Sequence, residues 1–143
     1  MTRRQLRENI FKALFRIEFN DLQERTEQLE FHLQELAEQE LEDGTIVFAD
    51  EQDLDYIKQK VLDIFAHLEE VDAAISGHTQ GWKINRIGKA ELAILRLAVY
   101  EMKFDDDVPQ GVAINEAVEL AKLYCDEEAK GFINAVLGKL AKS

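Results

Sequence analysis

Hydrophobic residues recur at intervals of three and four along most of the chain, the spacing that places side chains on one face of an α-helix. The first such stripe runs from Leu6 to Ile17 and follows Thr2, a residue suited to the N-cap position. A second, narrower stripe lies among acidic residues between about residues 24 and 41. Each stripe predicts an amphipathic helix with one face in the core.

The middle of the chain continues this pattern after a short interruption. Asp43-Gly44 predicts a turn, and Ile46-Val47-Phe48 is short enough for a strand but stands alone, so we interpret it as a connector. Asp50 or Asp53 then caps a helix whose apolar positions extend from Tyr56 to Ile75, before Ser76-Gly77 interrupts them.

The C-terminal part is the most apolar. Residues 89–104 are apolar on most sides, which predicts a central, buried helix, and Asp105–Pro109 ends it. A further helix covers residues 112–121, and Asp126 opens the last one. With no βα alternation, we predict an all-α fold: a compact bundle of six or seven helices in two small subdomains, about 1–80 and 81–143, that meet near Trp82.

Composition limits the functional classes. The chain has 143 residues, one cysteine, 17 Lys and Arg against 29 Asp and Glu, and a net charge of −12. This length suits one domain, a lone Cys125 excludes an internal disulfide framework, and the acidity argues against coating nucleic acid through the overall field. No leader pattern or membrane-spanning run is evident, so we expect a cytoplasmic protein.

The charge is unevenly distributed. Residues 1–16 contain five basic residues and one acid, whereas residues 18–55 contain fourteen acids and one base. Arg3, Arg4 and Arg7 fall on one arc of the first helix, where cations oppose the helix dipole at a cost of about 0.3–1 kcal/mol each. The alternative is a solvated face with a chance excess of arginine. The unfavourable position favours a functional site for anions.

Catalytic and metal motifs are not evident. The sequence has no Gly-rich phosphate loop, and its three histidines lack metal-ligand spacing. Cys125 is interpreted as a structural cysteine and the many carboxylates as solvated surface groups. We therefore expect no enzyme, no cofactor and no metal.

Cations and aromatic residues occur together near Asp126. Single-strand nucleic-acid binding uses cations for phosphates and aromatic rings for base stacking, and this region supplies Lys122, Tyr124, Lys130 and Phe132. The alternative is that both rings pack the angle between two helices.

Residues 82–141 resemble the C-terminal half of the NusB family of bacterial antitermination factors. The resemblance rests on Leu95-Arg96-Leu97-Ala98, Val108-Pro109, the run Ala113–Lys122, and Phe132-Ile133-Asn134. The opening Arg-rich helix with Ala13-Leu14-Phe15 also matches, and the similarity is weakest over residues 24–55.

The resemblance implies a helical protein that binds the boxA element of nascent rRNA transcripts together with the ribosomal protein NusE. That complex joins RNA polymerase and other Nus factors and suppresses termination, and some relatives form homodimers. The implied protein-partner residues are Phe15 and Glu91. Arg96 also lies in a shared motif, and its half-buried setting is as consistent with a structural role as with a binding role. The implied RNA-binding residues are Arg3, Arg4, Arg7, Lys122, Tyr124, Lys130 and Phe132.

Two rival functions stay open. Similar domains precede rRNA cytosine methyltransferases, and a helical bundle could bind only protein. Three residues also depart from the family pattern. Gln5 stands where another arginine is common, and Gly131 precedes Phe132 where bulkier residues occur. Glu128 would repel phosphate unless it reads a base edge.

Overall fold

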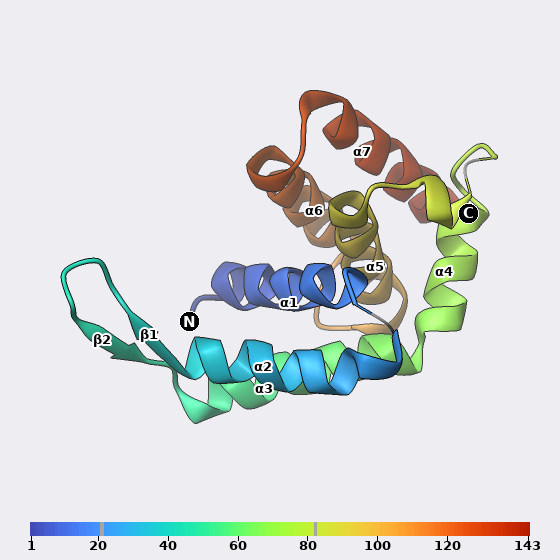
Figure 1. Ribbon diagram of the computed structural model, residues 1–143. Helices are drawn as coiled ribbons and strands as arrows, with labels where there is room; N and C mark the ends of the chain where they lie inside the picture. Colours follow the sequence, from blue (N-terminus) through green and yellow to red (C-terminus); the bar gives the residue numbers. More distant parts are fainter. Residues whose placement is uncertain (21, 82) are drawn as a thin grey trace. The chain divides into compact units, whose positions relative to one another are not determined.

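Seven α-helices dominate the computed structural model, which describes residues 1–20, 22–81 and 83–143 (Figure 1). The helical class expected from the apolar spacing is therefore confirmed. The helices fall into two compact units, residues 1–63 and residues 64–143. The sequence-based division near residue 80 stays a prediction, and Trp82, at which the halves are predicted to meet, lies outside the described residues.

The first unit is built on a pair of neighbouring helices, α1 (Arg3–Glu18) and α2 (Arg25–Ala37), with the 3-10 helix η1 (Leu22–Glu24) before α2. Their apolar stripes are buried, including Leu14 on α1 and Leu29 on α2. The Arg16 guanidinium of α1 donates to both carboxylate oxygens of Glu35 on α2, at 2.8 and 3.3 Å. An ion pair of 2.9 Å between Lys58 and Glu30 joins α3 (Glu51–Ala66) to α2.

A β-hairpin extends from the ends of α2 and α3, where the sequence analysis predicts a longer helix and a connector (Figure 1). Strand β1 (Glu38–Glu40) pairs antiparallel with β2 (Ile46–Phe48). The interpretation of Ile46–Phe48 as a connector is wrong. Its partner strand consists of Glu and Gln, which carry no strand signal, so the pairing was not visible in the sequence.

The turn of this hairpin explains why α2 ends early. Gly44 has φ +85°, a conformation that glycine adopts without a steric penalty, and its N–H donates to the Leu41 carbonyl at 2.9 Å. The Asp43 carboxylate accepts from the Thr45 N–H at 2.9 Å. The predicted turn at Asp43-Gly44 is therefore confirmed, and it reverses the chain so that residues 38–40 pair across it.

The apolar pattern between Tyr56 and Ile75 belongs to two helices. Helix α3 ends at Ala66 and α4 covers Leu68–Ser76, so a continuous helix is not formed. At the break, the His67 N–H donates to the Ile64 carbonyl at 3.1 Å, a tightened turn, and the His67 ring lies 4.1 Å from the Phe104 ring centroid. No Pro or Gly marks this break in the sequence.

Helix α5 (Lys89–Phe104) is the centre of the second unit and contacts α4, α6 (Gln110–Tyr124) and α7 (Glu127–Lys142). All residues from Leu92 to Glu101 are buried, which confirms the prediction of a central helix. The 3-10 helix η2 (Ile84–Arg86) precedes it.

Three predicted N-caps are confirmed by side-chain hydrogen bonds. The Thr2 hydroxyl accepts from the Gln5 N–H at 3.1 Å, and the Gln5 side chain accepts from the Thr2 N–H at 2.8 Å. Asp50 accepts from the Gln52 N–H at 2.8 Å, and Asp126 from the Ala129 N–H at 2.9 Å. These caps satisfy N–H groups that the first turn of a helix leaves unpaired.

The surroundings of His32 on α2 predict that acid destabilises the folded protein. Burial, followed by the nearby Arg16 charge, lowers the pKa of His32 from the usual 6.5, and its Nε2 atom has no partner among the described residues. The unfolded chain therefore takes up a proton at higher pH than the folded one. As pH falls below about 6.5 toward the lowered folded pKa, the free energy of unfolding should fall.

Urea unfolding of the wild type and of His32→Gln, from about pH 8 to about pH 5, tests this prediction. The wild type should lose more stability over this interval than the variant. Identical pH profiles would contradict a lowered pKa of His32 in the folded protein.

Candidate functional site

The N-terminal arginines lie on a firmly held helix end. Arg3 and Arg4 are exposed in the first turn of α1, Arg7 is half-buried, and that first turn carries no acidic residue. The Met1 ammonium pairs with Asp53 on α3 at 2.9 Å, which ties down the start of the chain. The cluster thus adds guanidinium donors to the positive end of a capped helix, which is an arrangement suited to anions.

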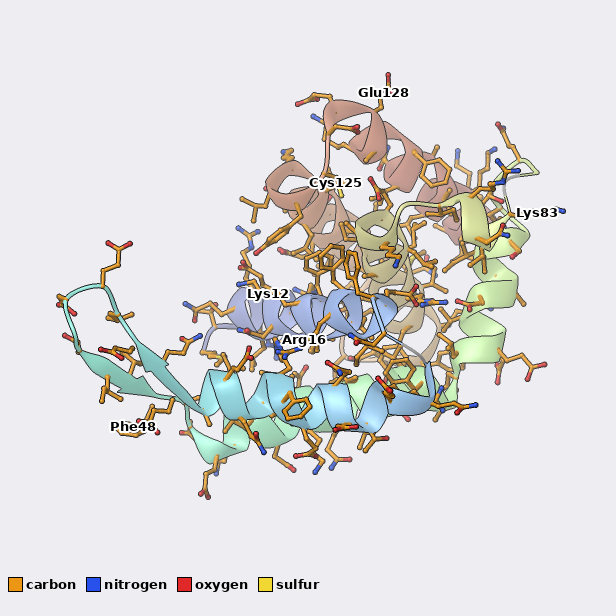
Figure 2. All side chains as sticks on the ribbon, viewed as in Figure 1. Lys12, Arg16, Phe48, Lys83, Cys125 and Glu128 are labelled. Carbon is orange, nitrogen blue, oxygen red and sulfur yellow. The ribbon has the colours of Figure 1, made fainter. Side chains whose placement is uncertain are left out.

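The two other cations of α1 are held by carboxylates. Lys12 lies 3.6 Å from Glu8 on the same helix, and Arg16 forms the bidentate pair with Glu35 described above. Figure 2 shows both side chains on α1. Arg16 therefore ties α1 to α2. Arg3, Arg4 and Arg7 lie closer to the start of the same helix.

Phe15 belongs to a row of aromatic rings along α1. Its ring centroid lies 5.9 Å from that of buried Phe11 and 4.9 Å from that of exposed Phe19, the latter in edge-on geometry. Phe15 is half-buried, so it links the core to a surface ring. Phe19 is not among the residues predicted from the sequence, although its spacing of four from Phe15 places it on the same face.

The turn between α6 and α7 holds the second predicted group. Lys122 pairs with Glu119 at 3.0 Å, and Lys130 pairs with Glu127 at 2.9 Å. Such pairs at the surface contribute about 0–1 kcal/mol, so an approaching phosphate can replace the carboxylate. Tyr124 is exposed at the end of α6, next to exposed Leu123, which the sequence analysis also missed.

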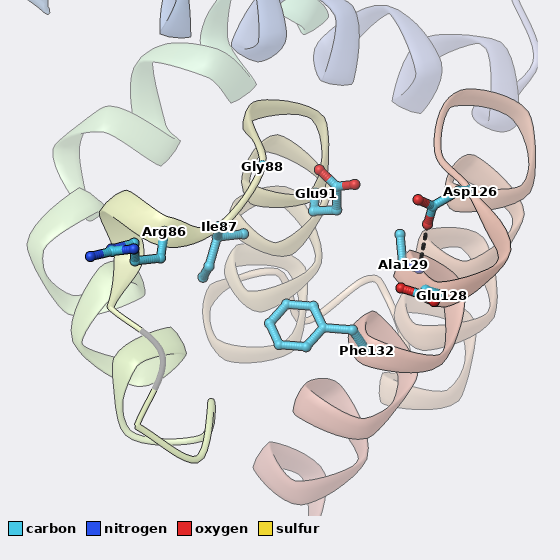
Figure 3. A pocket seen from close by; sticks show the side chains of 8 residues that line it. All are labelled: Arg86, Ile87, Gly88, Glu91, Asp126, Glu128, Ala129 and Phe132. Atoms are coloured by element: carbon cyan, nitrogen blue, oxygen red, sulfur yellow. Dashed lines mark hydrogen bonds between the residues drawn. The ribbon is translucent and has the colours of Figure 1, made fainter.

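Phe132 and Glu91 line one pocket of the second unit, although the sequence analysis assigns them to different partners. The pocket has a volume of about 300 Å³. Figure 3 shows the Phe132 ring on one side and the Glu91 carboxylate on another. Its lining residues are Arg86, Ile87, Gly88, Glu91, Asp126, Glu128, Ala129 and Phe132.

The chemistry of this pocket is aromatic and anionic. Asp126 uses one carboxylate oxygen to cap α7, whereas Glu128 is exposed at the rim. Three carboxylates against one arginine make the pocket unfavourable for phosphate and favourable for hydrogen-bond donors and cations. Arg86 was missed because it comes from η2, a segment remote in sequence from α7.

Glu91 is folded back over the start of its own helix. A Cβ atom at Gly88 would collide with the Glu91 carboxylate, so a larger residue there would require the Glu91 side chain to move. Burial, followed by the charge of Glu91 and a hydrogen bond with it, raises the pKa of the Cys125 thiol to about 12. Cys125 therefore stays protonated at neutral pH and is no nucleophile.

Arg96 is part of the structure of the second unit. It is 7% exposed, and its Nε and Nη2 atoms donate to the two carboxylate oxygens of Asp72 on α4 at 2.9 and 3.0 Å. Of the two roles that the sequence leaves open for Arg96, this geometry supports the structural one.

The predicted RNA-binding residues fall into one set in each unit, with Arg3, Arg4 and Arg7 in the first. Over the described ranges, no cluster of three or more His, Cys, Asp or Glu could hold a metal ion. In the same part of the chain, no helix is long and apolar enough to cross a membrane.

Comparisons with known proteins agree on one family. A model of the NusB family matches residues 4–142. The transcription antitermination protein NusB of Agathobacter rectalis is 49% identical over 141 residues, which cover 99% of this chain and 100% of the relative.

Solved structures give the same result. NusB of T. maritima superposes with a TM-score of 0.80 at 32% identity, covering 100% of this chain and 92% of that one. A structure of the antitermination factors NusB and NusE in complex with dsRNA has a TM-score of 0.76 at 27% identity, covering 99% and 98% of the two chains.

Proposed function

This chain belongs to the NusB family, and we propose that it is a non-catalytic antitermination factor that binds the boxA RNA of nascent rRNA transcripts together with NusE. The observation that carries this proposal is the cluster of Arg3, Arg4 and Arg7 at the capped start of α1. In a chain with a net charge of −12, these residues form a local cationic group. The solved NusB–NusE–dsRNA complex supports the choice of RNA and NusE as partners.

Some of the proposed RNA-binding residues contact phosphates and others contact bases. Arg3, Arg4 and Arg7 present planar guanidinium donors to phosphate oxygens. Lys122 and Lys130 exchange their surface carboxylate partners for phosphates.

The aromatic residues of the second unit hold the bases. Tyr124 flanks a base, and the Phe132 ring offers a stacking surface worth about 1–3 kcal/mol per base. The Glu128 carboxylate at the pocket rim repels phosphate but accepts a hydrogen bond from an exocyclic amine of a base that enters the pocket.

NusE contacts two half-buried residues, one in each unit. Phe15, with the exposed Phe19 next to it, supplies an apolar contact on the first unit. Glu91, at the pocket of the second unit, supplies a carboxylate for a basic ribosomal protein. The assembled complex then acts with RNA polymerase and other Nus factors in the cytoplasm.

A gel shift with boxA RNA and a scrambled RNA of equal length, each with and without NusE, tests this function. We expect a shift that is selective for boxA and strengthened by NusE. A shift of equal strength with both RNAs would contradict boxA recognition. No shift in any lane, with folded protein, would favour the purely protein-binding alternative.

A further inference from the structure

The hairpin of the first unit (residues 38–48) exposes every one of its residues, including several large apolar ones. Phe48, labelled in Figure 2, is 70% exposed and Ile46 is 49% exposed. Leu41 and Val47 on the same hairpin are exposed as well. Single exposed apolar residues are ordinary, but four within eleven residues form a patch of the kind that marks interaction sites.

The hairpin is held in one register. The Leu41 N–H donates to the Thr45 carbonyl at 2.8 Å next to the turn. At the other end, the Ala49 N–H donates to the Ala37 carbonyl at 3.0 Å, which continues the ladder to the adjoining helices. Isolated two-stranded sheets are only marginally stable, and a third strand is what usually completes them.

Strand β2 offers the edge for such a strand. In the described part of the chain the sheet consists of β1 and β2, so the outer edge of β2 faces no further strand. Edges of natural sheets are commonly protected by charged residues or proline, but Ile46-Val47-Phe48 has neither. Addition of an extended segment to an open edge is an established mode of peptide recognition.

The charge of the hairpin indicates which kind of segment would bind to it. The pairing register places Ile46 opposite Glu40 and Phe48 opposite Glu38, so apolar and acidic side chains share one face. Residues 38–48 carry four acids and no Lys or Arg, a charge that repels RNA and a second copy of the same hairpin. A cationic segment is attracted instead.

We propose that the β2 edge takes up a third strand from a partner protein, a segment in which Lys or Arg alternates with apolar residues. Neighbouring strands are about 4.8 Å apart, and Phe48 lies between the added strand and Glu38. The aliphatic part of a Lys or Arg side chain on the added strand can therefore pack on Phe48 while its charge approaches the Glu38 carboxylate. The alternate apolar residues fall on the face of Val47. None of residues 38–48 is among the proposed RNA-binding residues.

The test uses amide NMR spectra of the full chain and a blocked peptide of four Lys-Val repeats. We expect this peptide to shift amide signals of residues 38–48. Peptides of four Lys-Ser or four Glu-Val repeats should bind at least about tenfold more weakly, because they lack the apolar contact or the opposite charge.

Matched variants separate the hairpin from general surface effects. Ile46→Ser with Phe48→Ser should weaken Lys-Val binding at least about tenfold, whereas Phe31→Ser, at a residue 41% exposed on α2, should not. Glu38→Gln with Glu40→Gln should weaken it at low salt, while Glu24→Gln with Glu27→Gln should leave it unchanged. All four variants should bind boxA RNA as the wild type does.

Three kinds of result would overturn the proposal. The first is no shift of hairpin amides by the Lys-Val peptide, or equal binding of the Lys-Ser peptide. The second is a dimer in sedimentation that disappears in the Ile46→Ser, Phe48→Ser variant, which would make a second copy the occupant. The third is a shift of the hairpin amides by boxA RNA. None of these results concerns Arg3, Arg4 or Arg7, so the proposed RNA function would stand.

Discussion

Replacing Arg96 with alanine is expected to lower the free energy of unfolding by about 3 kcal/mol, the low end of the range for breaking a buried ion pair. The substitution removes two hydrogen bonds, of 2.9 and 3.0 Å, and leaves the Asp72 carboxylate without its partner. The low end applies because the Asp72 side chain is 24% exposed, so water partly replaces the guanidinium. Urea unfolding followed by circular dichroism measures the loss.

Two further variants separate charge, geometry and packing. Arg96→Lys keeps the positive charge but cannot form the planar bidentate pair, so it should recover only part of the loss. Arg96→Met with Asp72→Leu removes both charges and keeps apolar volume, so it should be closer to the wild type than Arg96→Ala. An Arg96→Ala protein within about 0.5 kcal/mol of the wild type, but defective in RNA binding, would contradict the structural role.

The parts of the fold that could be predicted from the sequence are those determined by residues close together in the chain. The stripe from Leu6 to Ile17 lies on a helix that starts at Thr2 as predicted, and Asp126 caps α7. The central helix was visible because residues 89–104 are apolar on most sides. Each of these features depends on side chains within a few residues of one another.

The features that were missed depend on contacts between distant segments. The hairpin needs Glu38–Glu40 to leave the helix and pair with Ile46–Phe48, and acidic residues give no sign of that. The break at His67 is accompanied by its contact with Phe104, a residue of another helix.

In the candidate site too, local features could be predicted from the sequence and contacts between distant segments could not. The resemblance supplied Glu91 and Phe132 as separate residues, and only the fold places them in one pocket. Gly88 and Arg86 of that pocket carry no chemical signal of their own in the sequence. The carboxylate partners of Lys122 and Lys130, by contrast, lie three residues away and were accessible to a local interpretation.

Replacing Arg3, Arg4 and Arg7 together with alanine is expected to weaken boxA binding about a hundredfold at roughly 0.1 M salt. Each phosphate contact with a single strand contributes a slope of about −0.7 in log K against log salt, so three contacts contribute about −2. Extrapolated from about 1 M to about 0.1 M salt, that slope amounts to roughly two powers of ten. The two proteins should therefore converge in affinity as salt rises.

The matched control removes the same charge from the same unit. Lys12→Ala, Lys58→Ala and Lys60→Ala together also take away three cations, but at positions outside the cluster. This control should keep most of the affinity and nearly the full salt slope. If both triple variants lost affinity equally, the effect would belong to net charge and not to the start of α1.

Thermal unfolding distinguishes a binding defect from damage to the fold. Cations in the first turn of a helix oppose its dipole by about 0.3–1 kcal/mol each, and the Thr2–Gln5 capping box stays intact in the variant. The variant should therefore unfold at the same temperature as the wild type or slightly above it. Loss of boxA binding with unchanged or increased stability would show that these arginines act in RNA binding. A clear drop in stability would point to a structural role instead.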